Sequence, residues 1–376
     1  MLFSKFVFCV LLLSVATLST VKSQGFVCKS TTISKCKSLA GYVAPNATTL
    51  ANITALFGLT DFNSLLGANN FPINTPQSKS VAANETIKIP FTCSCNNGTG
   101  ISDKSPVYVV KAGDGLDHIA RSIFALLVTY QEIAAVNSIT DPNMIKVGQS
   151  LRIPLSCSCD NVDADQVVHY AHVVPPKGTL EMISEEFGAT EESLLKLNSL
   201  ADAKELKAES VLDVPLRACT SMVSNTSSDY PLLVSDGTYT YTANNCIKCT
   251  CDLNNQNWVL FPKPDIWTLH CEPSSAPEVK VQNWQQCPSS QCKDGYGFPL
   301  GKPFYDGICH EKAPFERYCA YTGYNNQSRT ISTTLANVTA CTAGPSPSGS
   351  SKMGLQNWNL LWLAMNLGLL LYNALI

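Results

Sequence analysis

The sequence predicts an α+β protein in which three tandem strand–helix–helix–strand (βααβ) units precede a cysteine-rich, mainly β domain. The first observation is an internal repeat, because the stretches 87–95, 151–159 and 212–219 share an ending of alternating apolar and polar residues, a proline and cysteine. A repeat of nearly constant pitch indicates that one structural unit recurs. The second observation is that residues 219–341 hold ten cysteines, with strand-like sequence between turn signals.

The middle copy shows the order of elements most clearly. Residues 107–111 have the pattern of a short strand, and apolar residues at helical spacing after a glycine turn predict a helix over 116–127. A second helix opens at Thr129 and Glu132, which form a capping box, and it ends at Asn137. A returning strand at 150–153 completes the βααβ order.

The other two copies follow the same order. The third has strands at 170–173 and 211–214 around two helical stretches that end at Asn198. The first is the most divergent, since it keeps helical stretches at 50–57 and 65–69 but has a longer loop before its last strand. The repeat is therefore threefold and unequal.

Both ends of the chain carry hydrophobic segments that are typical of targeting signals. Residues 1–23 combine Lys5 with a short apolar run, as in a secretory signal peptide, and a membrane-spanning anchor is the alternative. Residues 342–351 are small and polar and precede a signal tail at 352–376, in which a polar spacer is followed by an apolar run from about Leu360 to Ile376. This pattern is typical of a GPI-attachment signal, with Ser348 or one of the next two residues as the attachment point, and a transmembrane helix is the alternative. We expect localisation on the extracellular face of the plasma membrane through a GPI anchor, after both hydrophobic ends are removed.

The cysteines and the glycosylation sequons also indicate an extracellular protein. Of the 17 cysteines, one lies in the predicted signal peptide, and the remaining 16 can form disulfides, which an oxidising compartment favours over zinc sites. Seven asparagines begin an N-x-S/T sequon: Asn46, Asn52, Asn84, Asn97, Asn225, Asn326 and Asn337. The formal net charge of −3 argues against nucleic acid as a partner and favours an uncharged ligand.

The repeated units resemble the LysM family, whose modules have the same βααβ order. The middle copy has Gly113-Asp114-Gly115-Leu116 before its first helix, Asn137 after its second, and G-Q-S-L-R-I-P at 148–154. The family commonly has threonine where Gly115 stands, so a helix-capping hydroxyl is lost. The resemblance covers about residues 28–219, and three copies joined by C-x-C spacers are similar to plant GPI-anchored LysM receptors of the chitin elicitor-binding type.

The resemblance implies the following organisation: LysM modules at 42–91, 107–155 and 169–216, a cysteine-rich domain at 219–341, and disulfides Cys28–Cys95, Cys36–Cys159 and Cys93–Cys157. The sequence alone leaves the pairing of these cysteines open. Cross-links between the modules are expected on separate grounds, because a unit of roughly fifty residues has a small core.

In a LysM module, the ligand groove lies between the turn after the first strand and the loop before the last strand. In the middle copy these are Gly113, Asp114, Gly115 and Leu116, and Ile139, Thr140, Asp141, Pro142, Asn143, Met144 and Ile145. Their backbone groups can bind the acetamido and hydroxyl groups of N-acetylglucosamine polymers, and the apolar side chains can contact sugar faces. The alternative is that Ile139 and Ile145 only close the core.

Three features favour the middle copy as the binding module. Sequons at Asn46 and Asn52 would place glycans on the first copy. The third copy carries glutamates at Glu181, Glu185, Glu186, Glu191 and Glu192, an acidic face exposed to solvent. In the middle copy, Pro142 stiffens the second loop, and a preorganised loop loses less entropy on binding.

The resemblance implies a receptor that binds chitin oligosaccharides and signals in innate immunity with a transmembrane LysM receptor kinase, with ligand-induced homodimers also possible. Peptidoglycan is the alternative ligand. A LysM-anchored glycoside hydrolase is disfavoured, because the scattered acids and the five histidines match no hydrolase motif. A wall-attached structural protein is the third alternative. We expect no enzyme activity, no cofactor and no metal.

Overall fold

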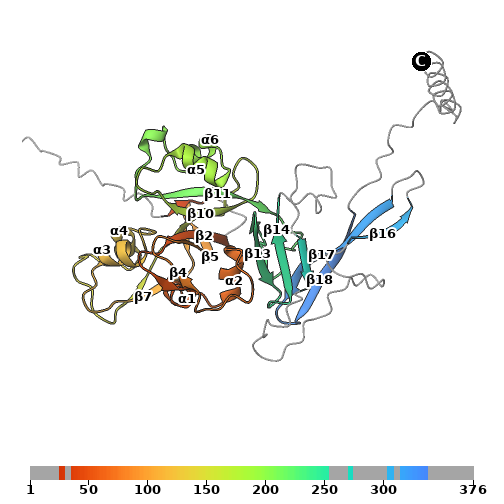
Figure 1. Ribbon diagram of the computed structural model, residues 1–376, viewed down its shortest axis with the longest axis horizontal. Coiled ribbons are helices and arrows are strands. Elements are labelled where there is room, and N and C mark those ends of the chain that lie inside the picture. Colours follow the sequence, from red (N-terminus) through yellow and green to blue (C-terminus); the bar gives the residue numbers. More distant parts are fainter. Residues whose placement is uncertain (1–24, 30–34, 254–269, 274–302, 309–313, 338–376) are drawn as a thin grey trace, which may run out of the picture.

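The computed structural model describes residues 25–29, 35–253, 270–273, 303–308 and 314–337 (Figure 1). The predicted signal peptide at 1–23, the attachment residue Ser348 and the C-terminal tail lie outside these residues. Within the described part of the chain, none of the helices combines the length and apolar character needed to span a bilayer.

Three segments of the chain have the strand–helix–helix–strand order. The first segment contains β2 (Lys35–Val43), β3 (Thr48–Thr49), α1 (Leu50–Phe57), α2 (Phe62–Ala68), β4 (Ser80–Val81) and β5 (Thr86–Asn96). The second segment contains β7 (Val107–Val109), α3 (Leu116–His118), the π-helical turn η1 (Ile119–Ile123), α4 (Tyr130–Val136) and β8 (Ser150–Arg152). The third segment contains β10 (Val167–Val173), α5 (Leu180–Phe187), α6 (Glu191–Leu197), the 3-10 turn η2 (Ala203–Glu205) and β11 (Val211–Cys219).

An eight-stranded sheet joins the first and third segments. Its order is β1 (Phe26–Val27), β6 (Thr99–Ser102), β5, β2, β10, β11 and β12 (Val234–Ser235), with β9 (Ser156–Cys157) also paired with β6. β2 and β10 run parallel at the centre, and each pairs antiparallel with its own partner, β5 or β11. The second segment stands outside this sheet, because β7 and β8 form a separate two-stranded sheet.

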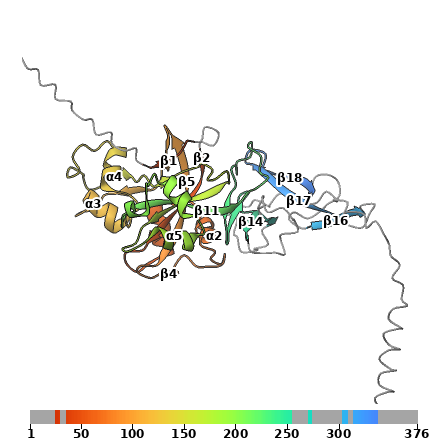
Figure 2. The same ribbon diagram turned by 90° about the horizontal axis from the view of Figure 1, so that it is seen from above.

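The helices and the C-terminal strands surround this sheet. In Figure 1, α5 and α6 lie on one side of the central strands, and α1 and α2 lie on the other. Both Figure 1 and Figure 2 place α3 and α4 at one end of the molecule and the C-terminal strands at the other. The first and second segments share one hydrophobic core, in which the rings of Phe57 and Phe124 meet edge to face with centroids 5.7 Å apart. A separate core fills the third segment, and Leu39 of β2 and Ala68 of α2 also belong to it.

The first helix of the second segment differs from the prediction. A regular helix over 116–127 was expected, but α3 ends at His118 and continues as a π-helical turn, in which the Phe124 amide donates to the Ile119 carbonyl. Positive φ angles at Ala125 and Leu126 end the turn. Phe124 is fully buried against Phe57, so packing of this aromatic side chain accompanies the departure from α-helical geometry.

One asparagine per segment joins the end of the second helix to the last strand. The Asn137 side-chain amide donates to the carbonyls of Ile133 and Arg152, and its Oδ1 accepts from the Arg152 amide, all at 2.8–2.9 Å. Asn69 makes the same three bonds with Leu65 and Lys88. Asn198 makes them with Leu194 and Asp213. The three segments therefore share a side-chain bridge as well as an order of elements.

The C-terminal part is built from two small antiparallel sheets. One contains β13 (Thr238–Thr242), β14 (Ile247–Cys251) and β15 (His270–Pro273), and the other contains β16 (Pro303–Ile308), β17 (Pro314–Asn325) and β18 (Thr330–Asn337). Disulfides Cys219–Cys251 and Cys249–Cys271 hold the first of these sheets. The strand expected at 238–242 is confirmed.

Candidate functional site

The two predicted binding loops leave the same end of the β7–β8 sheet. The strands are antiparallel, with Val109 at the end of β7 opposite Ser150 at the start of β8. The loop at 113–116 follows β7, and the loop at 139–145 precedes β8. Two backbone hydrogen bonds cross the base of these loops. The Val110 amide donates to the Gln149 carbonyl, and the Gly148 amide donates to the Val110 carbonyl. The sheet thus positions both loops side by side.

The first loop is fixed by the carboxylate of Asp114. Its Oδ2 accepts from the Lys111 amide at 2.7 Å and from the Tyr108 hydroxyl at 2.8 Å, and only 8% of the side chain is exposed. Burial and this hydrogen bond raise the pKa of Tyr108 above its usual range, so the phenol stays protonated. Gly113 has φ +89°, a conformation that favours glycine. Asp114 therefore shapes the loop from within.

Leu116 and Gly115 also have structural roles in the first loop. Leu116 is 2% exposed and belongs to the shared core, so its side chain does not face a ligand. Gly115 is the N-cap of α3 and supplies no side-chain cap, as expected for glycine. The corresponding caps of the other segments are Thr49 and Thr179, whose hydroxyls accept from the amides of Asn52 and Met182.

The second loop is also held by local bonds. The Asp141 carboxylate accepts from the amide and the side chain of Asn143 at 2.9 and 3.1 Å, and the Asp141 carbonyl accepts from the Met144 amide. At the loop's end, the Gln149 side chain accepts from the Lys146 amide at 3.0 Å. Thr140 and Asn143 are exposed, and Pro142 is half-buried. These bonds fix the shape of the loop.

The apolar residues of the second loop divide between core and surface. Ile139 and Ile145 are half-buried and pack against the shared core, so each closes the core and keeps an exposed part. Met144 is 70% exposed. Val147, which was not among the predicted residues, is 69% exposed and lies between the same loop and β8. An exposed valine in a turn carries no sequence signal that separates it from a core valine.

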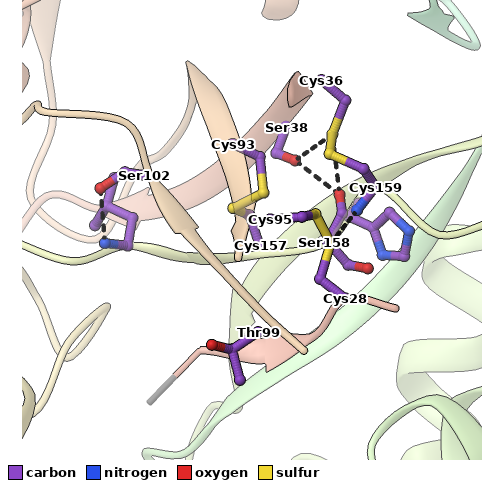
Figure 3. Close-up of a disulfide and its surroundings, with 12 residues drawn as sticks. Cys28, Cys36, Ser38, Cys93, Cys95, Thr99, Ser102, Cys157, Ser158 and Cys159 are labelled. Carbon is purple, nitrogen blue, oxygen red and sulfur yellow. Dashed lines mark hydrogen bonds between the residues drawn. A yellow bond between two sulfur atoms is a disulfide. The ribbon is translucent and has the colours of Figure 1, made fainter. Parts of the chain in front are cut away.

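Three disulfides join the segments to one another (Figure 3). Cys28 bonds to Cys95, Cys36 to Cys159 and Cys93 to Cys157, with Cα–Cα distances of 5.6–5.8 Å. These are the pairs that the family resemblance implies. The groups of metal-ligating side chains found within the described residues consist of these same cysteines, whose sulfurs are bonded to one another. They are therefore not free to ligate an ion.

The surfaces of the other two segments differ from this site. Asn46, Asn52 and Asn84 are exposed on the first segment, and Asn97, Asn225 and Asn326 are exposed elsewhere. The side chain of Asn337 lies outside the described residues. The five glutamates of α5, α6 and their surroundings are all exposed, which confirms the acidic face of the third segment.

A family model for the LysM domain matches residues 108–154 and 172–215. The chain is 44% identical over 331 residues to LysM domain-containing GPI-anchored protein 2 of Arabidopsis thaliana, covering 88% of this chain and 87% of the relative. It is 41% identical over 353 residues to chitin elicitor-binding protein of Oryza sativa subsp. japonica, covering 93% and 91%. Chitin elicitor receptor kinase 1 of Physcomitrium patens is 28% identical over 185 residues, or 49% of this chain and 28% of the kinase. The chain therefore belongs to the LysM domain-containing GPI-anchored proteins of plants.

Proposed function

We propose that this protein is a cell-surface pattern-recognition receptor that binds chitin oligomers through its second segment. The observation that carries the proposal is that similarity to the rice chitin elicitor-binding protein extends through nearly the whole chain. The preorganised loops of the second segment add a physical reason, since their exposed backbone groups and apolar side chains suit an uncharged acetylated sugar.

The proposed organisation has three LysM modules, at 42–91, 107–155 and 169–216, followed by a cysteine-rich domain at 219–341. The first module is the one outside the family match. Its assignment is supported by Asn69, which makes the same bridge between helix and strand as Asn137 and Asn198. A local arrangement shared by three segments of different sequence favours a common module.

In the proposed complex, the sugar chain lies between the two loops. Backbone groups near Gly113 and Gly115, together with Thr140 and Asn143, contact the polar groups. Met144 and the exposed part of Ile145 contact the acetyl methyls and sugar faces. Asp114, Asp141, Pro142 and Leu116 act by holding the loops, and Ile139 acts mainly by closing the core beneath them.

The proposed role is binding without catalysis. The second segment's loop carboxylates, Asp114 and Asp141, are engaged in turn hydrogen bonds. Among the described residues, His169 and Asp213 form a histidine–carboxylate pair at 2.9 Å, and each side chain is only 1% exposed, so a polymeric substrate cannot reach it. Glycoside hydrolysis requires carboxylates that face the scissile bond.

We also propose that a GPI anchor, attached at Ser348 or nearby, holds the protein on the outer leaflet. Signalling then requires a second protein, and a transmembrane LysM receptor kinase is the proposed partner, because a chitin elicitor receptor kinase is among the relatives. Chitin oligomers long enough to bind two receptors would also bring two copies of this chain together.

The test is retention of the full-length protein on chitin beads, with soluble chitin oligomers or peptidoglycan fragments as competitors. Met144→Glu and Ile145→Glu should each reduce retention strongly, because each places a charge against the sugar at the loop site. Met182→Glu is the matched control, since Met182 is 57% exposed on the third segment. Unchanged retention of the Met144 and Ile145 variants would exclude the second segment. If only peptidoglycan fragments competed, the ligand would be peptidoglycan and not chitin. If the oligomers were cleaved, the protein would be an enzyme.

A further inference from the structure

A groove of about 540 Å³ lies between the first segment and the start of the C-terminal part, away from the loops described above. One wall comes from β2, the start of α2 and β5, and the other comes from residues 228–242. We call this the junction groove. Its volume is in the range of ligand-binding pockets in proteins, which is about 300–1,000 Å³.

The C-terminal wall of the junction groove is rich in tyrosine. Tyr230 is 43% exposed and Tyr241 is half-buried. The rings of Tyr239 and Tyr241 meet edge to face, with centroids 5.7 Å apart. Phe91 lines the opposite wall. Partly exposed tyrosines offer flat apolar faces and polar hydroxyls together, which matches the mixed surface of a sugar ring.

The junction between the two walls is rigid. The Tyr239 hydroxyl donates to the Phe71 carbonyl, and Lys248 Nζ lies 4.6 Å from the Tyr239 ring centroid. Gly67 in α2 allows this approach, because a Cβ there would lie 2.1 Å from the Tyr239 carbonyl oxygen. β12 also extends the large sheet by pairing with β11. A ligand would therefore meet walls that are already in place, which lowers the entropic cost of binding.

The polar lining of the groove carries balanced charge. The lysine and aspartate side chains that line it are equal in number: Lys35 and Lys37, and Asp61 and Asp229. Lys37 donates to the Thr92 hydroxyl at 3.2 Å. Although Lys37 is exposed, the surrounding walls partly desolvate its ammonium and lower its pKa, against the opposing effect of Asp61 and Asp229. Hydroxyls of Thr60, Ser228 and Thr240 complete the lining. A neutral ligand with many hydroxyl groups suits this lining better than a charged one.

We propose that the junction groove is a second glycan-binding site, which takes a linear, uncharged oligosaccharide along the tyrosine wall. The site is formed by two parts of the chain and is separate from the loops of the second segment. It gives the C-terminal part a direct role in contacting polysaccharide, by holding a second stretch of glycan apart from the one bound by the loops.

The experiment is isothermal titration calorimetry on the full-length protein with hexamers of three neutral β-linked sugars: N-acetylglucosamine, glucose and xylose. The Met144→Glu background removes the proposed loop site, so binding that remains reports the junction groove. In this background, Tyr230→Ala should weaken the remaining binding by about tenfold or more, because a stacking face is lost. Tyr230→Phe keeps the ring and should retain most of the affinity. Tyr230 is exposed, so these variants should fold, and unchanged unfolding temperatures would verify this.

Other outcomes distinguish this proposal from the proposed function. Absence of binding by all three hexamers in the Met144→Glu background would overturn the junction groove, while leaving chitin binding by the loops intact. Residual binding that is unaffected by Tyr230→Ala and by Lys37→Gln would also overturn it. If Tyr230→Ala instead reduced only association with a LysM receptor-kinase ectodomain, the groove would be a protein interface and the glycan assignment would be wrong.

Discussion

The second and third segments share one fold but are supported in different ways. In the third segment, β10 and β11 pair over seven residues inside the large sheet, and the hydroxyls of Thr179 and Thr190 cap both helices. In the second segment, β7 and β8 pair over three residues outside that sheet, and α3 is three residues long with a glycine cap. Its stability depends more on the core it shares with the first segment and on the Cys93–Cys157 disulfide.

This difference indicates where a binding surface can form in a tandem repeat. Both edges of a strand at the centre of a sheet are hydrogen-bonded to neighbouring strands, as for β10 in the third segment. The helices of the third segment also present a charged face to solvent. The second segment projects from the end of the molecule, as Figures 1 and 2 show, and its loops are held by Asp114 and Asp141. Local side-chain bonds thus replace sheet pairing as the source of order at the proposed site.

The largest expected effect concerns a buried ion pair that the third segment contains. His169 Nδ1 lies 2.9 and 3.0 Å from the two carboxylate oxygens of Asp213, and Nε2 lies 2.8 Å from the Asp160 carbonyl. Asp213→Ala leaves the imidazolium without its partner and should cost about 3–5 kcal/mol of unfolding free energy. Native-state hydrogen exchange of the β10 and β11 amides measures this loss. His118→Gln is the control in the second segment, because His118 is exposed and should cost less than about 0.5 kcal/mol.

The pH dependence tests the charge state of the same pair. Burial alone would lower the pKa of His169, but the charge and hydrogen bond of Asp213 outweigh burial and raise it. The folded state then keeps a proton that the unfolded state releases, so this stabilisation is complete below about pH 6.5 and is lost as the pH rises through the folded pKa. His169→Gln should remove that dependence. Equal stability slopes above pH 6.5 in the wild type and the variant would show that His169 is neutral.

The bridging asparagines have the next largest expected effect. Asn137→Ala and Asn198→Ala each remove two donated bonds and one accepted bond, and each should cost about 1–3 kcal/mol, because buried backbone groups lose their partners. The comparison predicts different local results. Hydrogen exchange of the β7 and β8 amides should accelerate in Asn137→Ala, because only the three residue pairs between β7 and β8 then hold these strands together. For Asn198→Ala, the β11 amides should stay protected by pairing with β10. The same acceleration in both segments would refute the difference in support.

Local sequence patterns predicted much of this structure. Leu50, Ile53 and Phe57 have helical spacing, and all three are buried in α1. The capping box of Thr129 and Glu132 is present, and both of its bonds are formed. These features depend on residues within one turn of each other. The parallel pairing of β2 with β10 could not be predicted, because it joins residues 131 positions apart, such as Leu39 and Tyr170, without a pattern in either strand that specifies the other.

The candidate site shows the same division. Its two loops could be placed from the repeat, but the roles of their residues could not. Asp114 was predicted as a ligand contact, which stays a prediction, and the structure shows in addition that its carboxylate accepts hydrogen bonds from Tyr108 and Lys111. An aspartate between glycines has the same sequence pattern in either role. The junction groove had no sequence signal, because its walls come from residues more than a hundred positions apart.

The smallest expected effect concerns the helix caps. Thr179→Ala removes a hydroxyl that accepts from the Met182 amide and should cost about 1 kcal/mol. Gly115→Thr is the reverse change in the second segment, where a Cβ would meet no atom within 4 Å. It should gain roughly a few tenths of a kcal/mol, since glycine is already a fair cap and threonine restricts the unfolded chain. Exchange at the α3 and α5 amides measures both changes. A gain with unchanged retention on chitin would mean that Gly115 serves neither stability nor ligand access, while a gain with lost retention would mean that the open space at Gly115 is occupied by the sugar.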